Sequence, residues 1–183
     1  MMTPLPANRL LILACSATKR DGPAYMPAIE RYDGPLWRTL RSVDPRGEKA
    51  KVAFLSARLG FRAAATPIEI YDARMTPAIA AEMKAGDLGT RWPKQKTTRL
   101  VMASGEHPGM HIATLTGYGR VPFSDIALVG GHLYLDVMRR LVDLFRERGH
   151  IVGDARITEI NGSIGIMRRD LRRWLHNEFA EGR

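Results

Sequence analysis

Residues 9–15 read RLLILAC, a run that is apolar from Leu10 to Leu13 and ends on the single cysteine of the chain. Two later runs have the same character, KVAFLSA at 51–57 and DIALVGG at 125–131. Strands that are apolar on both faces are typical of a parallel sheet covered by helices on each side. Because each run leads into a turn and then a helical pattern, we predict an α/β fold with a mostly parallel central sheet and helices on both faces.

Helical apolar spacing accounts for much of the chain between and after these runs. In GPLWRTLRSV at 34–43, three apolar side chains share one helical face, and the proline stands near the first turn, where a missing N–H costs little. The same criteria, with Thr76 as an N-cap and Gly149 as a stop, predict further helices. The predicted helices span 34–43, 76–84, 132–149 and 164–179.

A chain of 183 residues, 45% apolar and 26% charged, is long enough for one α/β domain and too short for two ordinary ones. We therefore predict a single domain over the whole chain, with residues 1–8 as a flexible N-terminus. Residues 58–75 are expected to form a long loop. Residues 87–124, which are broken by glycine and proline, are expected to form an irregular insertion with one helix and one strand near 111–116.

The charge of the chain is strongly positive, with 28 Lys and Arg against 19 Asp and Glu and a net charge of +9. A polyanion is therefore an expected partner. Nucleic acid is favoured over a membrane surface because no long basic amphipathic segment carries the aromatic anchors of interfacial helices. The alternative interpretation is an arginine-rich composition that reflects the genome alone.

The number of cysteines and the hydropathy of the chain indicate the cellular compartment. One cysteine allows no disulfide within the chain and no cysteine-based zinc site. The N-terminal residues lack the basic start and apolar run of a signal peptide, and no apolar run approaches the roughly 20 residues that span a bilayer. We expect a cytoplasmic protein without a membrane partner.

Small and polar residues follow all three predicted strands. Open parallel sheets bind ligands at the carboxyl ends of their strands, so these residues are expected to meet in one site. Small residues allow close backbone approach, and main-chain N–H groups with a cation suit a phosphate, a sugar or a planar base. Turn formation alone is the alternative at any one strand end. The candidate substrate-binding residues are Cys15, Ser16, Thr18, Ser56, Arg58, Gly130, Gly131 and His132.

Two residues of these loops are candidates for catalysis. Asp72, in the loop after the second strand, can act as a general base or hold a sugar hydroxyl, and Lys19 can neutralise a phosphate. Tyr71, beside Asp72, can bind substrate by stacking on a base. The structural alternatives are an Asp72 bonded to loop amides and a solvated Lys19. For Cys15 we favour a small apolar residue over a nucleophile.

No sequence motif indicates a metal or a cofactor. His107 and His111 have a spacing of four, but Pro108 and Gly109 between them oppose a helix that would bring them together. No Walker loop or GxGxxG follows a predicted strand, and there is no GxSxG elbow. We therefore expect neither a metal nor a cofactor.

Arginines are dense on the last two predicted helices, where they form the most basic surface visible in the sequence. A basic loop at 92–96 would extend this surface along a nucleic-acid backbone. The alternative is solvated helix faces paired with Asp143, Glu147 and Asp170. The expected backbone contacts are Arg139, Arg168, Arg169, Arg172 and Arg173, with Arg140, Trp92, Lys94 and Lys96 as further members.

Six short motifs follow one another along the chain. They are ACSATK at 14–19, RYDGPLW at 31–37, FLSARLGF at 54–61, IYD at 70–72, LVGGHLY at 128–134 and NGSIGIMRRDLRRWL at 161–175. Together they resemble a bacterial and phage family of unknown function that is distantly related to the peroxide-stress protein YaaA. The resemblance implies an α/β fold, DNA binding and a role in processing modified bases or nucleosides, and it assigns no residue roles. It spans most of the chain but not GEHPGMHIATLTGYGRVPF at 105–123.

We therefore expect an enzyme, a glycosylase-like hydrolase, that cleaves an N-glycosidic bond in nucleic acid or nucleosides or modifies a base of DNA. Asp72 would activate water or stabilise positive charge on the sugar, and Lys19 and Arg58 would hold phosphate. The alternatives are a non-catalytic DNA-binding protein of the YaaA type and a transferase of phage DNA hypermodification. DNA is expected as partner ahead of RNA, and the oligomeric state is left open.

Overall fold

The computed structural model of the chain describes residues 8–91 and 106–178. The expected flexible N-terminus, apart from Asn8, and the basic loop with Trp92, Lys94 and Lys96 lie outside the described residues. Within the described ranges, no helix has the length and apolar character that crossing a membrane requires.

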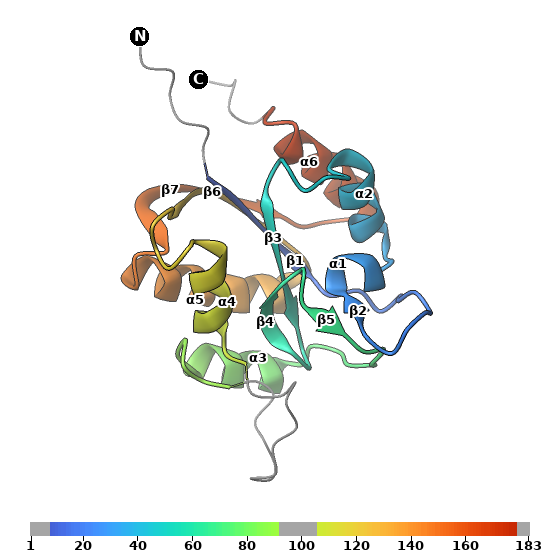
Figure 1. The fold of residues 1–183 in the computed structure, drawn as a ribbon, viewed down its shortest axis with the longest axis horizontal. Helices are drawn as coiled ribbons and strands as arrows, with labels where there is room; N and C mark the ends of the chain where they lie inside the picture. The colour runs from blue at the N-terminus through green and yellow to red at the C-terminus, as the bar shows by residue number, and fades with distance from the viewer. Residues whose placement is uncertain (1–7, 92–105, 179–183) are drawn as a thin grey trace.

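The sheet is mixed and mostly parallel (Figure 1). In the described ranges the strands are β1 (Arg9–Ala14), β2 (Met26–Pro27), β3 (Lys51–Ser56), β4 (Gly60–Ala63), β5 (Pro67–Ile68), β6 (Phe123–Val129) and β7 (Ile151–Ile160). Five of them form one sheet in the order β4-β3-β1-β6-β7, and β2 pairs with β5 separately. β1 pairs in parallel with both β3 and β6, and β7 pairs in parallel with β6. β4 is antiparallel to β3 and forms an edge.

Helices cover both faces of the sheet, because β1 is apolar on both of its faces. The described helices are α1 (Ala28–Arg31), α2 (Pro35–Val43), α3 (Pro77–Ala85), α4 (Pro108–Leu115), α5 (His132–Glu147) and α6 (Ile164–Leu175). Leu10 and Ile12 pack into one core with α3, α4 and α5. Leu11 and Leu13 pack into a second core with α1, α2 and α6. The predicted α/β class with helices on both faces follows from this alternation (Figure 1).

The helices predicted from apolar spacing are confirmed. Those predicted over 34–43, 76–84 and 132–149 are α2, α3 and α5, and they match within two residues at each end. The Thr76 hydroxyl accepts a hydrogen bond of 3.2 Å from Ile79 N, the N-cap contact expected at this position. The last predicted helix begins at Ile164 as expected, although the described helix α6 ends at Leu175.

Three parts of the chain are more regular than predicted. The expected long loop contains β4, which turns back on β3 at Gly60, whose φ of +72° suits glycine. The strand expected near 111–116 is wrong, because α4 covers most of this segment. Pro108 occupies the first helical position, where its missing N–H costs nothing, so it begins the helix instead of preventing it. The strand β7 has ten residues, whereas the sequence indicates only a short strand or a loop at its end, ITEI at 157–160.

His111, one of the two histidines with a spacing of four, joins α4 to the sheet. The Ala63 N–H donates to His111 Nδ1 at 3.1 Å, so the ring proton lies on Nε2, which is 2.6 Å from Glu106 Oε2. Burial lowers the pKa of His111 below its usual value, and Glu106 offsets this only in part. The imidazole is therefore a neutral link between β4 and α4.

A buried carboxylate ties α6 to the sheet. Asp125 of β6, 2% exposed, accepts hydrogen bonds from Arg9 Nε at 2.8 Å, Arg156 Nη2 at 2.7 Å and Trp174 Nε1 at 3.2 Å. Burial alone would raise the pKa of this carboxyl. The hydrogen bonds from Arg156 and Arg9 outweigh burial and hold the pKa below its usual value.

We predict that Asp125→Asn lowers the free energy of unfolding by about 3–5 kcal/mol, because it leaves two arginines beside a neutral group. Since the folded pKa of Asp125 lies below the unfolded one, its contribution is present at neutral pH. The contribution is lost as the pH falls below about 4 and through the folded pKa. Urea unfolding against pH measures both effects. The control Asp143→Asn breaks an exposed ion pair and should cost less than about 1 kcal/mol. Equal losses in the two variants would contradict this role.

Candidate functional site

The order of the strands reverses direction beside β1. From β1 the chain passes through α2 to β3 on one side of β1, and it later returns as β6 on the other side. At such a point the connections leave the sheet in opposite directions, and a crevice opens outside the carboxyl ends of the strands. Open α/β sheets bind their ligands in this crevice. The carboxyl ends of β1 and β6 therefore define the candidate site.

A cavity of ≈ 390 Å³ lies at this position. Its walls come from the loop that follows β1, the first turn of α2, the loop between β6 and α5, and the start of α6. The lining residues are Ala14 to Thr18, Gly34 to Trp37, Gly130, Gly131, Tyr134, Ile164 and Met167. The volume is in the range of small-molecule sites in proteins.

Three helices begin at this cavity. Their N-caps are Gly34 for α2, Gly131 for α5 and Ser163 for α6. In the described structure no side chain caps any of the three by a hydrogen bond, and none of their first turns contains an acidic residue. The first N–H groups of a helix have no partner within it, and the helix dipole adds positive potential there. Together the three helix ends favour an anion, and a phosphate in particular.

Glycines keep the walls of this cavity close together. A Cβ on Gly34 would lie 2.3 Å from Ser16 Oγ, and a Cβ on Gly130 would lie 2.9 Å from Ala14 Cβ. Hydrogen bonds fix the same walls: Trp37 Nε1 donates to Ala14 O at 3.0 Å, and Asn161 Nδ2 donates to Gly130 O at 2.7 Å. The helix ends are thus held in place before any ligand binds.

A thiol and a phenol lie on the inner wall. Cys15 Sγ is 3.3 Å from Tyr134 OH, and both residues line the cavity. Burial, followed by the proximity of Cys15, raises the pKa of Tyr134, so its hydroxyl stays protonated. Sequence reasoning missed Tyr134. Its position in the first turn after a Gly-Gly strand end is the signal that would have identified it.

A second polar cluster, formed by Lys19, Tyr32, Ser56 and Tyr71, lies behind Cys15. Tyr71 OH is hydrogen-bonded to Ser56 Oγ at 2.7 Å and also to Tyr32 OH. Lys19 Nζ lies 4.3 Å from the centre of the Tyr71 ring and donates to Ser16 O at 2.9 Å. Burial lowers the pKa of Lys19, while Cys15 and Asp72 partly offset this effect. We refer to these four residues as the tyrosine–lysine cluster.

The predicted site residues divide between the cavity and its surroundings. The two strand-end turns lie at the same edge, as the hydrogen bond of 2.9 Å from Cys15 N to Leu55 O shows. Cys15, Ser16, Thr18, Gly130 and Gly131 line the cavity as expected. The predicted residues outside its lining are Lys19, Ser56, Arg58, Tyr71, Asp72 and His132.

Two of these residues are buried beside the cavity and do not line it. Ser56 is fully buried, and its Oγ accepts hydrogen bonds from the N–H groups of Arg58 and Leu59, so it closes the turn after β3. Tyr71 is 7% exposed and lies beneath Lys19, which leaves it unable to present its ring to a base. Tyr71 lies against Lys19, and Ser56 holds the Tyr71 hydroxyl by a hydrogen bond.

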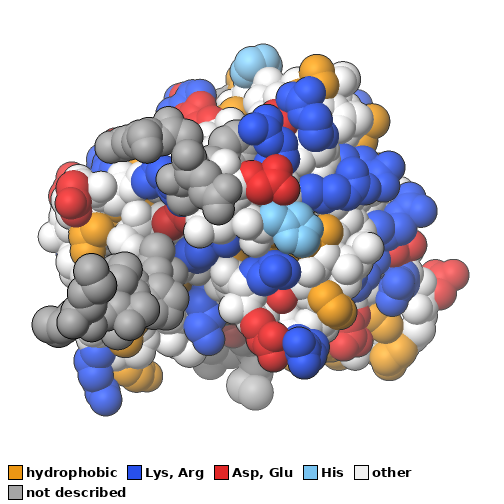
Figure 2. Space-filling view, turned by 90° about the horizontal axis from the view of Figure 1, so that it is seen from above, with side chains coloured by type: hydrophobic (Ala, Val, Ile, Leu, Met, Phe, Trp, Pro, Cys, Tyr) orange, Lys and Arg blue, Asp and Glu red, His pale blue; other side chains and the backbone are white. Residues whose placement is uncertain are grey.

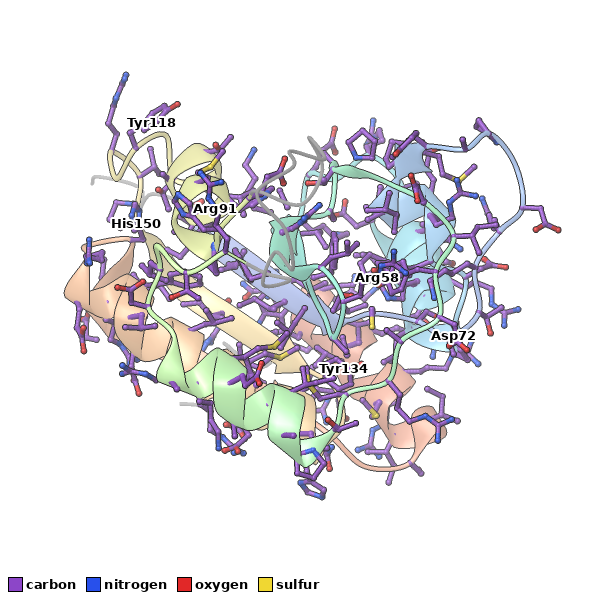
Figure 3. The ribbon with its side chains drawn as sticks, turned by 90° about the horizontal axis from the view of Figure 1, so that it is seen from below. Arg58, Asp72, Arg91, Tyr118, Tyr134 and His150 are labelled. Carbon is purple, nitrogen blue, oxygen red and sulfur yellow. The ribbon has the colours of Figure 1, made fainter. Side chains whose placement is uncertain are left out.

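Arg58 and Asp72 are exposed on loops of the carboxyl edge. Figure 3 shows Arg58 and Asp72 on the same side of the molecule as Tyr134, while Arg91, Tyr118 and His150 lie on the other side. Asp72 is near enough for its charge to raise the pKa of Lys19. The two predicted catalytic residues therefore lie near each other, and Lys19 is bonded to the cavity wall at Ser16 O.

The five predicted backbone-binding arginines do not form one surface, because α5 and α6 cover opposite faces of the sheet. Arg139 of α5 is bonded to Glu159 at 2.6 Å. On α6, Arg168 donates to Thr39 Oγ1, Arg169 pairs with Asp170, Arg173 pairs with Glu178, and Arg172 is exposed. Figure 2 shows Lys and Arg side chains gathered on the side of the molecule formed by α2 and α6.

Comparisons of the chain with protein-family models, curated proteins and solved structures gave no match. The geometry of the cavity and of the tyrosine–lysine cluster therefore carries the functional argument.

Proposed function

We propose that this protein is an enzyme acting on nucleic acid or nucleosides, and that it cleaves an N-glycosidic bond or modifies a base of DNA. The observation that carries the proposal is the convergence of three uncapped helix N-termini on one cavity at the switch point of the sheet. Such an arrangement favours a ligand with a phosphate group, and a nucleotide is the common biological ligand that combines a phosphate with a planar body.

The cavity has a polar side and an apolar side, as a nucleotide requires. The main-chain amides of the helix ends and the hydroxyls of Ser16 and Thr18 supply the polar side. Leu36, Ile164 and Met167 supply an apolar side on which a base can pack. We assign the phosphate to the helix ends and the base to the apolar side.

The chemistry is assigned to the groups behind Cys15. In hydrolysis of an N-glycosidic bond, water forms a bond to the sugar C1′, the bond from C1′ to the base breaks, and the base leaves with a proton. Asp72 would take the proton of the attacking water or stabilise positive charge on the sugar. Lys19, held in place by Tyr71 and Ser16 O, would balance the negative charge of the substrate.

A non-catalytic DNA-binding protein is the second candidate. The observation that favours it is the charge of α2 and α6, whose sequences PLWRTLRSV and IGIMRRDLRRWL contain six arginines and one aspartate. Release of a base distinguishes the two, since the binding protein forms a complex and releases nothing.

We predict that Gly131→Asp weakens binding of deoxynucleoside 5′-monophosphates at least about 10-fold, because it places a carboxylate at the N-cap of α5 beside the anion site. The fold should be unaffected, since Gly131 has a φ of −72°, a Cβ there meets nothing within 4 Å, and Asp is a favoured N-cap. The matched control Gly131→Asn has the same size and the same capping oxygen without the charge, so it should lose clearly less affinity than Gly131→Asp does. Calorimetric titration measures the affinity of both variants for the monophosphate. Equal affinities of Gly131→Asp and the wild type would contradict an anion site at this helix end.

We predict that Asp72→Asn lowers base release roughly 10²- to 10⁴-fold while the melting temperature and ligand affinity stay near those of the wild type. Asn keeps the size of Asp and loses its charge and basicity, and Asp72 is exposed, so the fold does not depend on it. Mass spectrometry of bases released from DNA and from nucleosides measures activity on the same preparation as the melting curve. Normal turnover by this variant would exclude Asp72 from the mechanism.

A further inference from the structure

Two isoleucines are exposed where α6 begins. Ile164 is 49% exposed and lines the cavity, and Ile166 is 44% exposed on a different side of the same turn. The inward positions of the helix, Met167 and Leu171, are buried in the core. The two isoleucines are therefore not part of the core, and Ile166 lies two residues after the cavity-lining Ile164.

Arginines follow each isoleucine along the same side of the helix. Residues three or four positions apart share one side of a helix. Ile164 therefore heads a row with Arg168 and Arg172, and a second row places Ile166 ahead of Arg169 and Arg173. The α6 helix has 12 residues and is about 18 Å long, which matches about five phosphates of one DNA strand at 3.4 Å each.

Among the helices of the described ranges, α2 and α6 carry the excess of positive charge. The helices α2 and α6 hold six arginines and one aspartate, as given above, and they pack against each other through the contact of Arg168 Nε with Thr39 Oγ1 at 3.1 Å. By contrast, α5 on the opposite face holds three arginines and three acidic residues. A polyanion is thus drawn to the face on which the exposed isoleucines lie.

We propose that the first turn of α6 is a wedge for duplex DNA, in which Ile166 enters the base stack while the extruded nucleotide occupies the cavity. This inference rests on the proposed function. Apolar side chains that insert between base steps, combined with arginines on the flanking phosphates, are a general means of unstacking a duplex. An enzyme that acts on a base in a duplex must move that base out of the stack, and Ile164 stands where the nucleotide would enter.

The local backbone leaves room for this insertion. Gly165 stands between the two isoleucines, and a Cβ there would meet nothing within 4 Å, so the surface of the turn is open. Gly162 lies beside Ile166, since a Cβ on Gly162 would lie 3.7 Å from Ile166 Cγ2. The two glycines therefore place no side chains of their own beside the wedge.

The test compares Ile166→Ala with the wild type on three ligands: a short DNA duplex, one strand of that duplex, and a deoxynucleoside 5′-monophosphate. Fluorescence anisotropy measures the first two affinities and calorimetry the third. We expect the variant to lose about 10-fold in affinity for the duplex, because it no longer supports the unstacked step, and less than about 2-fold for the other ligands. The matched control Val121→Ala removes an apolar side chain that is 56% exposed and precedes β6, at the opposite edge of the sheet from the first turn of α6, and it should change none of the affinities.

Each outcome distinguishes the wedge from the proposed function. A loss confined to the duplex supports the wedge. An unchanged affinity for the duplex, or an equal loss on all three ligands, overturns it, and binding of the monophosphate by the wild type then still supports the proposed function. Failure of the wild type to bind any of the three ligands overturns both.

Discussion

Parallel pairing of β1 with β3 and β6 is the constraint on which the rest of the structure depends. Parallel strands end at one edge of a sheet, so each helix that directly follows a strand starts at that edge. In this chain α5 follows β6 and α6 follows β7, while α2 begins after the loop that leaves β1. The meeting of three helix N-termini is therefore a consequence of the topology, and the cavity is the space that these helices leave above β1 and β6.

The electrostatic character of the site follows from the same arrangement. Positive potential at the helix ends comes from main-chain dipoles, which do not titrate. The Cys15 thiol and the Tyr134 hydroxyl are hydrogen-bonded to each other, and burial keeps Tyr134 protonated. Lys19, which titrates, lies to one side and is supported by Tyr71. The proposed roles follow this division: the backbone binds the anion, and the side chains of the neighbouring cluster act on the bond that breaks.

Much of the fold could be predicted from local pattern, and the rest depended on contacts distant in sequence. Apolar runs identified β1, β3 and β6, and caps such as Thr76 identified helix starts. The strand β4 is only four residues long and its pairing with β3 is invisible to periodicity, while the proline that begins α4 resembled a helix breaker. Ser56 was predicted to bind substrate because it follows a strand, and Tyr71 because it stands beside Asp72 in the next loop. Their hydrogen bond to each other appears only when β3 and the loop after β5 are brought together. The convergence of helix ends required the position of β6 beside β1, which no local signal encodes.

The central claim is that main-chain amides at three helix ends bind one anion. Two-dimensional amide NMR of the 15N-labelled chain during titration with a deoxynucleoside 5′-monophosphate tests this claim most directly. We predict saturable shifts, with one common dissociation constant, for the first-turn amides of all three helices: Leu36 and Trp37 in α2, His132 and Leu133 in α5, and Gly165 and Ile166 in α6. Shifts confined to the later turns of α6, which carry its arginines, or shifts that saturate differently at the three helix ends, would contradict it.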